Sequence, residues 1–284
     1  MNEEKNLVKN TFYRSLESGA SGAMAMSINI MTLMWMRTTI NYQYRYGVNT
    51  PDAFKQLYNN GGIPRFYKGF IPALFQGPLS RFGDTAANTG TIILLNSYQE
   101  TSNLPITVKS FCASINAALF RIFLMPIDTL KTTMQVHGSE GISNLKYKLK
   151  TKGPSILYHG SIASSTATLV GHYPWFTTFN ILQEKIPHSD SNLGKMSRNA
   201  LIGFTSTCIS DILSNSIRVV KVYKQSSIKL ISYKETITKI INEDGIYSLL
   251  GRGLKTKLLA NGLQGIIFSV LWKYIDENFF KNKN

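Results

Sequence analysis

The 284-residue sequence is poor in the side chains that build disulfide frameworks, metal sites and most catalytic centres. Its two cysteines, Cys112 and Cys208, lie in apolar stretches, and we expect small buried residues rather than a disulfide pair. The four histidines are scattered, and none has the spacing of a metal site. We therefore predict no catalytic residues, no enzyme activity, and no metal or other cofactor.

Acidic residues are also scarce, with 16 Asp and Glu against 31 Lys and Arg, which gives a formal net charge of +15. Such an excess points to anionic partners: nucleic acid, anionic lipid or acidic metabolites. No secretory signal is expected, because Met1–Arg14 is polar and mixed in charge, and Glu3 and Glu4 do not suit an amphipathic transit peptide. Overall hydrophobicity is modest, which favours helices that line a wet cavity over a bundle embedded in lipid on all sides.

Charge is missing from two long stretches. Ser18–Met36 contains no charged residue and is long enough to span a bilayer, which needs roughly 20 residues. Its small residues would let helices approach closely; they are Ser18, Gly19, Gly22, Ala23 and Ser27. Lys152 and Glu184 bracket a second run without Asp, Glu, Lys or Arg, which is hard to explain in a soluble basic protein.

The most informative stretch is Arg121–Gln135, RIFLMPIDTLKTTMQ. It is typical of an apolar helix interrupted by Pro126, because proline removes one backbone hydrogen bond and bends a helix. Asp128, Lys131 and Gln135 follow at spacings that place them on one face. A kinked apolar helix with charges on a single face suits a segment with lipid behind it and water or protein in front. The short pattern alone fits a soluble helix equally well.

The block recurs twice in weaker form. Ser216–Gln225 (SIRVVKVYKQ) aligns Lys221 with Lys131, and Thr32–Asn41 (TLMWMRTTIN) aligns Arg37 with it. A second block bounded by glycines follows each copy, at Gly62–Gly69, Gly153–Gly160 and Gly245–Gly253. The period is roughly a hundred residues, and repeats of that size are helical hairpins stacked on one another.

These motifs resemble the signature of the mitochondrial carrier family, Pro-x-Asp/Glu-x-x-Lys/Arg followed by a Gly block that ends in an aromatic, a basic residue and Gly. Repeat two carries the first half as Pro126, Asp128 and Lys131, and repeat one carries the end as Tyr67–Gly69. Repeats one and three depart from the Pro-x-Asp pair. The resemblance implies an all-α membrane protein with six tilted transmembrane helices in three pseudo-symmetric repeats and three short amphipathic matrix-side helices. It also implies a monomer with multiple passes through the mitochondrial inner membrane.

We expect a single domain over residues 1–284, with repeats at 12–100, 105–187 and 194–282. Met1–Thr11 would be a tail. The six long helices are expected at Phe12–Asn41, Pro72–Tyr98, Pro105–Val136, Ser161–Ile186, Gly194–Gln225 and Leu254–Phe280. One short helix would begin after Thr50 as N-cap with Pro51 in its first turn. The other two are expected near Ser139 and over Ser232–Asn242.

The joints between short and long helices each carry a basic residue and a glycine: Lys68 with Gly69, His159 with Gly160, and Arg252 with Gly253. Helix N-termini bind phosphate through free N–H groups, and a neighbouring cation suits a lipid headgroup. In the family these joints hold cardiolipin, and the resemblance implies that cardiolipin or another anionic lipid binds here. The alternative is an ordinary glycine turn with a solvated cation.

In the family, the charged residues after the kinks form a matrix gate in which each acid pairs with the base of the next repeat. The resemblance implies a gate of Arg37, Asp128, Lys131, Arg218 and Lys221, accompanied by Gln135 and Gln225, with Met34 at the remaining position. Only Asp128 with Lys221 keeps the pairing. Arg218 would face Arg37, and such a like-charge contact costs on the order of 1 kcal/mol. We therefore expect a weak gate unless an anion fills it.

Substrate contacts are expected deeper in the cavity. Arg121 and Asp211 precede gate positions by seven residues, about 10 Å along the helix, and ionisable groups at mid-membrane are functional candidates. A structural ion pair with each other, or with Arg218, is the alternative. By resemblance, further contacts lie on the even helices at Gln76, Ala167, Thr168 and Ala260, with Asp84 joining them. We assign Arg81 and His172 to contacts between helices.

We therefore predict transport of a small charged metabolite across the mitochondrial inner membrane by alternating access. One alternative is an adaptor or membrane-morphology protein that keeps the carrier scaffold without transport, because the gates depart from the family pattern. A less favoured alternative is a soluble basic helical protein that binds RNA. The basic residues concentrate at joints and loops, so we expect no nucleic acid partner.

Overall fold

The computed structural model describes residues 27–188 and 191–275, and all regular structure in these ranges is helical. The helical class predicted from the sequence is therefore confirmed for this part of the chain. Four expectations lie outside these ranges: the tail Met1–Thr11, the helix start at Phe12, the small residues Ser18–Ala23 and the helix end at Phe280.

The long helices lie close to their expected bounds. A first helix ends at residue 46 and is described from residue 27. It is followed by α4 (Phe70–Ser97), α6 (Ile106–Phe123) with α7 (Met125–His137), α9 (Ser161–Lys185), α10 (Asn192–Ser226) and α13 (Leu254–Ile275). The expected third helix is thus divided at Leu124. Pro126 lies in the first turn of α7, where its missing N–H costs no intrahelical bond.

Short helices connect the long ones in the same order in each repeat. They are α2 (Thr50–Asn59) and α3 (Gly62–Phe66), α8 (Glu140–Lys152) and the 3₁₀ turn η1 (Pro154–Tyr158), and α11 (Tyr233–Asp244) and α12 (Ile246–Gly251). A further short helix, α5 (Gln99–Ser102), links the first repeat to the second. The expected N-cap Thr50 is wrong by one residue. Asn49 caps α2, because its Oδ1 accepts from the backbone N–H of Asp52 at 2.9 Å.

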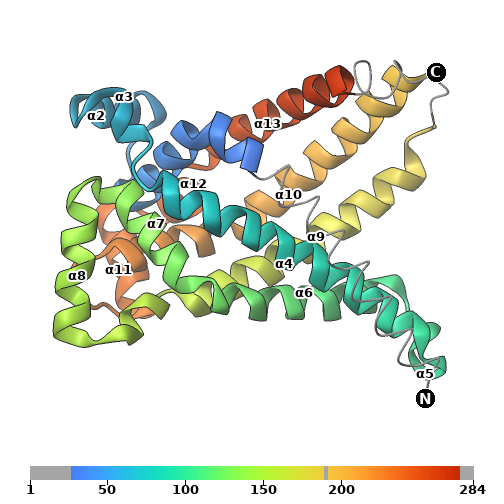
Figure 1. Cartoon of the computed structure of the whole chain (residues 1–284), viewed down its shortest axis with the longest axis horizontal. Coiled ribbons are helices and arrows are strands. Elements are labelled where there is room, and N and C mark those ends of the chain that lie inside the picture. Colours follow the sequence, from blue (N-terminus) through green and yellow to red (C-terminus); the bar gives the residue numbers. More distant parts are fainter. Residues whose placement is uncertain (1–26, 189–190, 276–284) are drawn as a thin grey trace.

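The short helices gather at one end of the bundle. Figure 1 shows α8, α11 and α12 close to α7, with α2 and α3 beside them, whereas α6, α9 and α10 extend away and separate toward the other end. The helices therefore lie closest together at the end where we expect the gate residues; we call it the tied end of the bundle.

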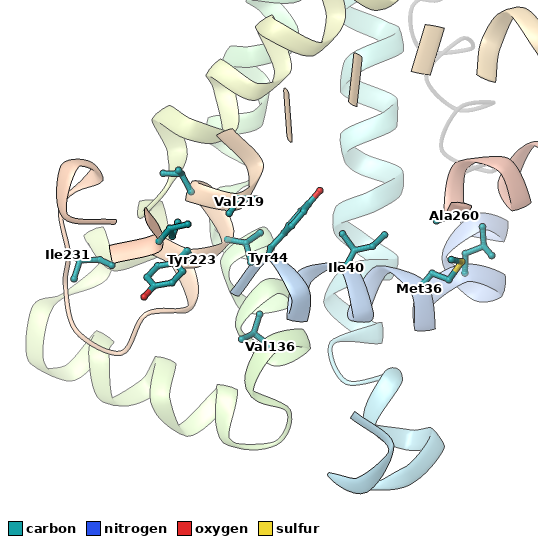
Figure 2. Close-up of a cluster of buried hydrophobic side chains, with 12 residues drawn as sticks. Met36, Ile40, Tyr44, Val136, Val219, Tyr223, Ile231 and Ala260 are labelled. Carbon is teal, nitrogen blue, oxygen red and sulfur yellow. The ribbon is translucent and has the colours of Figure 1, made fainter. Parts of the chain in front are cut away.

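A buried apolar cluster closes the bundle at this end and joins the first repeat to the last (Figure 2). Ile40 and Tyr44 of the first helix pack with Val219 and Tyr223 of α10. The remaining members come from the first helix, α7, α10, α11, α13 and the segment before α11; they are Leu33, Met36, Val136, Val220, Val222, Ile231, Ile240 and Ala260. Because the first and last repeats meet in one core, the three hairpins form a closed arrangement rather than an open row.

The joint glycines position the long helices against the next repeat. Gly69, Gly160 and Gly253 have φ values of 85°, 92° and 65°, a backbone conformation that favours glycine. A Cβ on Gly69 would lie 3.0 Å from the Lys131 carbonyl oxygen, and one on Gly160 would lie 3.1 Å from Gln225 Cγ. Counting the long helices from one to six, Gly69 and Gly160 bring an even helix into close contact with the odd helix that follows. Gly253 brings the sixth helix against the first, where a Cβ would lie 2.9 Å from Tyr44 Cε1.

Candidate functional site

Asp128 is the centre of a buried polar network at the tied end of the bundle. Its carboxylate accepts from Lys131 Nζ at 2.8 Å and from Lys221 Nζ of α10 at 2.6 Å. The predicted contact between Asp128 and Lys221 is confirmed. Lys131, for which the sequence offered no partner in the first repeat, also donates to Gln76 Oε1 of α4 at 2.8 Å. The Asp128 carboxylate thus forms ion pairs with lysines from two repeats.

Two glutamines add further hydrogen bonds between the repeats at this level. Gln225 Nε2 donates to Asp128 Oδ2 and to Thr129 Oγ1, both at 3.2 Å. Gln135 accepts from Asn41 Nδ2 of the first helix at 2.5 Å. We refer to Asn41, Gln76, Asp128, Lys131, Gln135, Lys221 and Gln225 as the Asp128 network. It connects the first helix, α4, α7 and α10 by polar contacts.

Arg121 and Asp211 do not pair with each other, and neither forms an ion pair with Arg218, so this structural alternative from the sequence is wrong. Arg121 donates to Asp84 Oδ2 of α4 at 2.5 Å. Asp211 accepts from Lys257 Nζ of α13 at 2.7 Å and from Asn261 Nδ2 at 2.5 Å. Each charge therefore has its own counter-charge on a neighbouring even helix. The sequence missed both pairings because the partners lie far away in the chain.

The other predicted substrate residues are buried as well. Gln76 is held by Lys131, and Thr168 Oγ1 donates to the Ser164 carbonyl in its own helix. Ala167 and Ala260 are buried, and Ala260 belongs to the apolar core. A direct role of these four residues in substrate contact stays a prediction.

Arg218 of α10 stands where repeat two has Asp128. It is half-buried, and its Nε donates to Ser214 Oγ at 3.1 Å. Its guanidinium also approaches α9, since a Cβ on Gly171 would lie 3.6 Å from Nη2. Arg218 and Arg37 both lie within electrostatic range of Lys257. Positive charge therefore accumulates beside the Asp128 network, although direct contact between the two arginines stays a prediction.

The contacts between helices expected for His172 and Arg81 stay a prediction. His172 lies within electrostatic range of Asp84 and Arg81 of α4, Arg121 of α6 and Arg218 of α10.

The three predicted lipid joints differ in how accessible they are. The Arg252 side chain is only 1% exposed, and its guanidinium donates to Asp244 Oδ2 at 2.5 Å. Lys68 and His159 are half-exposed. Burial, with Lys224 and Lys148 nearby, lowers the pKa of His159, so neutral imidazole prevails near pH 7. The basic side chain at the third joint is thus already engaged within the protein.

A cavity of about 230 Å³ lies at this third joint. Asn49 and Thr50 line it from the N-terminus of α2, and Gly251–Gly253 line it from the turn before α13. Lys255 contributes a further positive charge to its wall. Two helix N-termini and a lysine therefore share one recess, which suits an anionic headgroup.

Three bases connect the repeats at helix C-terminal ends; the sequence singled out only Arg252 among them, and in another role. Arg65 donates to the carbonyl oxygens of Gln135 and Val136 at 2.9 and 2.7 Å. Lys148 donates to the Gln225 carbonyl at 3.4 Å, and Arg252 donates to those of Tyr44 and Arg45 at 3.4 Å. Cations suit the exposed carbonyls of a helix end. The spacing of residues along the sequence does not predict these contacts, because each base and the carbonyl oxygen that it contacts belong to different repeats.

The cysteines and the potential metal ligands are the last residues of interest. Cys112 and Cys208 are free, as expected, but they are partly exposed rather than buried. No group of three or more potential metal ligands occurs in the part of the chain that the structure describes.

The closed helical repeats, the kink before Asp128 and the ion pairs between repeats define a carrier-type protein. The sequence model of the family "Mitochondrial carrier protein" matches residues 8–90 and 102–190, which is more than half of the chain. The protein therefore belongs to the mitochondrial carrier family. Members of this family are transporters of solutes rather than enzymes, and the family points to a mitochondrial membrane.

One curated relative is a mitochondrial carrier-like protein of Acanthamoeba polyphaga mimivirus. It is 24% identical over 172 residues, which cover 61% of this chain and 66% of the relative. The alignment thus spans just under two thirds of that protein.

Proposed function

We propose that this protein transports a small charged metabolite across the mitochondrial inner membrane by alternating access, through six membrane-spanning segments. The observation that carries this proposal is the Asp128 network, which ties the odd helices of repeats two and three at the end where the short helices gather. A network of ion pairs and hydrogen bonds can be made and broken as a unit, as alternating access requires.

The distribution of side chains on the long helices supports a membrane environment. On α4, Ile71, Phe75 and Leu79 follow one another at every fourth position and are all exposed. Gln76 and Asp84 of the same helix are buried. A water-soluble bundle shows the opposite arrangement, with apolar residues inside. The face that points away from the bundle is thus suited to lipid.

The same arrangement recurs on α6, where Phe111, Ile115 and Leu119 are exposed and Ser110 and Ser114 are buried. Among the described residues, α6 is the one helix whose length and hydropathy alone qualify it as a membrane span. The others carry inward polar residues that lower their mean hydropathy. We therefore base the six proposed spans on the apolar residues of the exposed face of each helix, and not on the mean hydropathy of the whole helix.

We also propose that an anionic lipid such as cardiolipin binds at the joints. The recess between Asn49–Thr50 and Gly251–Gly253 supports this for the third joint. There the backbone N–H groups and Lys255 would hold the headgroup, since Arg252 is engaged by Asp244. We propose a monomer as the working unit, because the three repeats already close on themselves.

Transport is tested by reconstituting the full chain into liposomes that contain cardiolipin and measuring uptake of a panel of labelled metabolites. We expect saturable uptake of at least one charged solute, and its loss in Asp128→Lys. An inert protein that is folded and inserted would contradict transport and favour the adaptor role on the same scaffold.

Membrane integration is tested separately by carbonate extraction of mitochondria that contain the protein. We expect the chain to stay in the membrane pellet, because its exposed apolar stripes have no soluble partner. Release into the supernatant would contradict the proposed spans.

A further inference from the structure

We propose that His137 is a second lock at the tied end of the bundle, separate from the Asp128 network, and that its protonation opens this lock. The neutral imidazole holds the ends of three helices together, whereas the charged ring is repelled by the cations around it. This inference rests on the proposed function in one respect, because it concerns how the tied end opens.

His137 connects all three repeats at the points where their odd helices end. Tyr46, His137 and Ser226 are the final residues of the first helix, α7 and α10, respectively. His137 Nε2 lies 2.7 Å from the Ser226 carbonyl oxygen, and Nδ1 lies 3.4 Å from the Tyr46 hydroxyl oxygen. Asp128 precedes His137 in the same helix by about 14 Å of helix length. His137 therefore forms a separate layer of contacts between the repeats, nearer the end of the bundle.

The two partners of His137 determine its tautomer. A carbonyl oxygen only accepts hydrogen bonds, so Nε2 carries a hydrogen and donates it to Ser226. In the neutral ring Nδ1 has no hydrogen, and it accepts from the Tyr46 hydroxyl. Protonation at Nδ1 removes this acceptor, so the contact with Tyr46 is lost in its present form.

Three cations from other elements surround the ring. Arg45 of the first helix, Arg65 of α3 and Lys148 of α8 all lie within electrostatic range of His137. Arg65 and Lys148 are held in place because they donate to carbonyl oxygens at the ends of α7 and α10. The Arg45 guanidinium lies 4.0 Å from the centre of the Tyr223 ring. A proton on His137 would thus place a fourth positive charge among three that are already anchored.

The remaining groups near the ring do little to offset this charge. Glu140 of α8 lies within electrostatic range of Tyr46, but its side chain is exposed, and water screens exposed charges. From α10 the ring meets the uncharged Ser226 carbonyl. Burial, together with the nearby cations, lowers the pKa of His137 from its ordinary value of 6.5, although the hydrogen bond to Ser226 opposes the shift. The closed tied end therefore favours the neutral ring.

This preference makes closure depend on pH. A ring released into water holds its proton more tightly than the ring in the closed end, so opening takes up a proton below pH 6.5. Closure is most stable above pH 6.5 and becomes less stable as the pH falls toward the lowered pKa. Acidification on the side of the short helices would then favour opening toward that side.

The test measures how often the tied end opens, by reaction of a water-soluble maleimide with a cysteine placed there. Ser226→Cys is the reporter, in the full chain in detergent with Cys112→Ala and Cys208→Ala. The Ser226 residue is 1% exposed, and its hydroxyl donates to the Val222 carbonyl in the same helix. His137 contacts the backbone of Ser226, so the reporter leaves that contact in place.

Four variants of the reporter protein separate the contacts at about pH 7.5, where histidine is neutral. His137→Phe should raise the labelling rate about fivefold, because the loss of one ordinary hydrogen bond changes an opening equilibrium by about that factor. Tyr46→Phe removes only the second contact and should also raise the rate. His137→Gln should have a smaller effect, since its amide can still donate to the Ser226 carbonyl. His188→Gln is the control, because His188 is exposed after α9, and it should leave the rate unchanged.

The pH dependence distinguishes a lock that titrates from a contact that only packs. The labelling rate with His137 is divided by the rate with His137→Gln at each pH, which cancels the ionisation of the reporter thiol. This ratio should rise as the pH falls from about 7.5 to about 5.5, the range in which histidine titrates. A purely structural contact would keep the ratio constant.

Thermal unfolding of the chain without the reporter gives a second readout. The melting temperature of the wild type, relative to that of His137→Gln, should fall as the pH decreases below 6.5, because the unfolded chain then binds the proton more tightly. A difference that does not change with pH would contradict the lock.

The outcomes separate this inference from the proposed function. An unchanged labelling rate in His137→Phe, or a constant ratio across the pH range, would overturn the lock even if the liposomes take up a metabolite. A ratio that rises at low pH, in a chain that takes up none of the labelled metabolites, would support the lock and contradict transport.

Discussion

Asp128 lies between two lysines, with Lys131 Nζ 2.8 Å and Lys221 Nζ 2.6 Å from its carboxylate oxygens. The first lysine belongs to the same helix and the second to the next repeat. The carboxylate is therefore both a local ion pair and a connection between repeats.

A charge swap tests this connection. Asp128→Lys should abolish uptake in liposomes, because it places three cations together, and removing one member of a buried pair costs about 3–5 kcal/mol. Adding Lys221→Asp should restore only part of the activity, since Lys131 then faces the new cation. If the double variant recovers nothing, the two side chains do not face each other during transport.

The pairs Arg121–Asp84 and Asp211–Lys257 predict which double variants restore stability. Arg121→Gln should lower the melting temperature in detergent by leaving Asp84 unpaired, and adding Asp84→Asn should restore most of it. The matched control combines Arg121→Gln with Asp211→Asn. Because these residues are not partners, their effects should add, and restoration in this control would refute the observed pairing.

The joint glycines allow a test with an internal reference. Gly69 and Gly62 both have positive φ, at 85° and 66°, so alanine strains the backbone at either position by about 1–2 kcal/mol. A Cβ on Gly69 would lie 3.0 Å from the Lys131 carbonyl oxygen of another helix, whereas a Cβ on Gly62 would meet only Pro64 Cδ at 3.8 Å, an ordinary contact. Gly69→Ala should therefore lower the melting temperature more than Gly62→Ala. Equal effects would mean that the close approach is unimportant.

Lys148 on α8 predicts a pH dependence. Burial, with Arg45 nearby, lowers its pKa to about 8 from the ordinary value of 10.5. Above pH 8 the unfolded chain holds this proton more tightly than the folded protein, so stability from this group rises between about pH 8 and 10.5. The melting temperature of the wild type should thus rise with pH relative to Lys148→Met. The exposed Lys150 supplies the control, and the same pH-dependent difference in Lys150→Met would refute the assignment.

Several local features could be predicted from single stretches of sequence. The helix break before Asp128 follows from Pro126, and the common face of Asp128 and Lys131 follows from their spacing of three residues. The contact between Asp128 and Lys221 required in addition the alignment of two repeats. The N-cap of α2 was misplaced by one residue because Asn49 and Thr50 are both good capping residues, and their backbone conformations decide between them.

The partners of Arg121 and Asp211 could not be predicted in this way. The two residues occupy equivalent places in their repeats and carry opposite charges, which suggested that they belong together. The charges they contact are on α4 and α13, 37 and 46 positions away in the chain. Which charge lies within reach depends on how each helix is rotated about its own axis and how far it is shifted along its neighbour. Both are set by packing of side chains across the whole bundle, as at the joint glycines, so they exist only once all three repeats have come together.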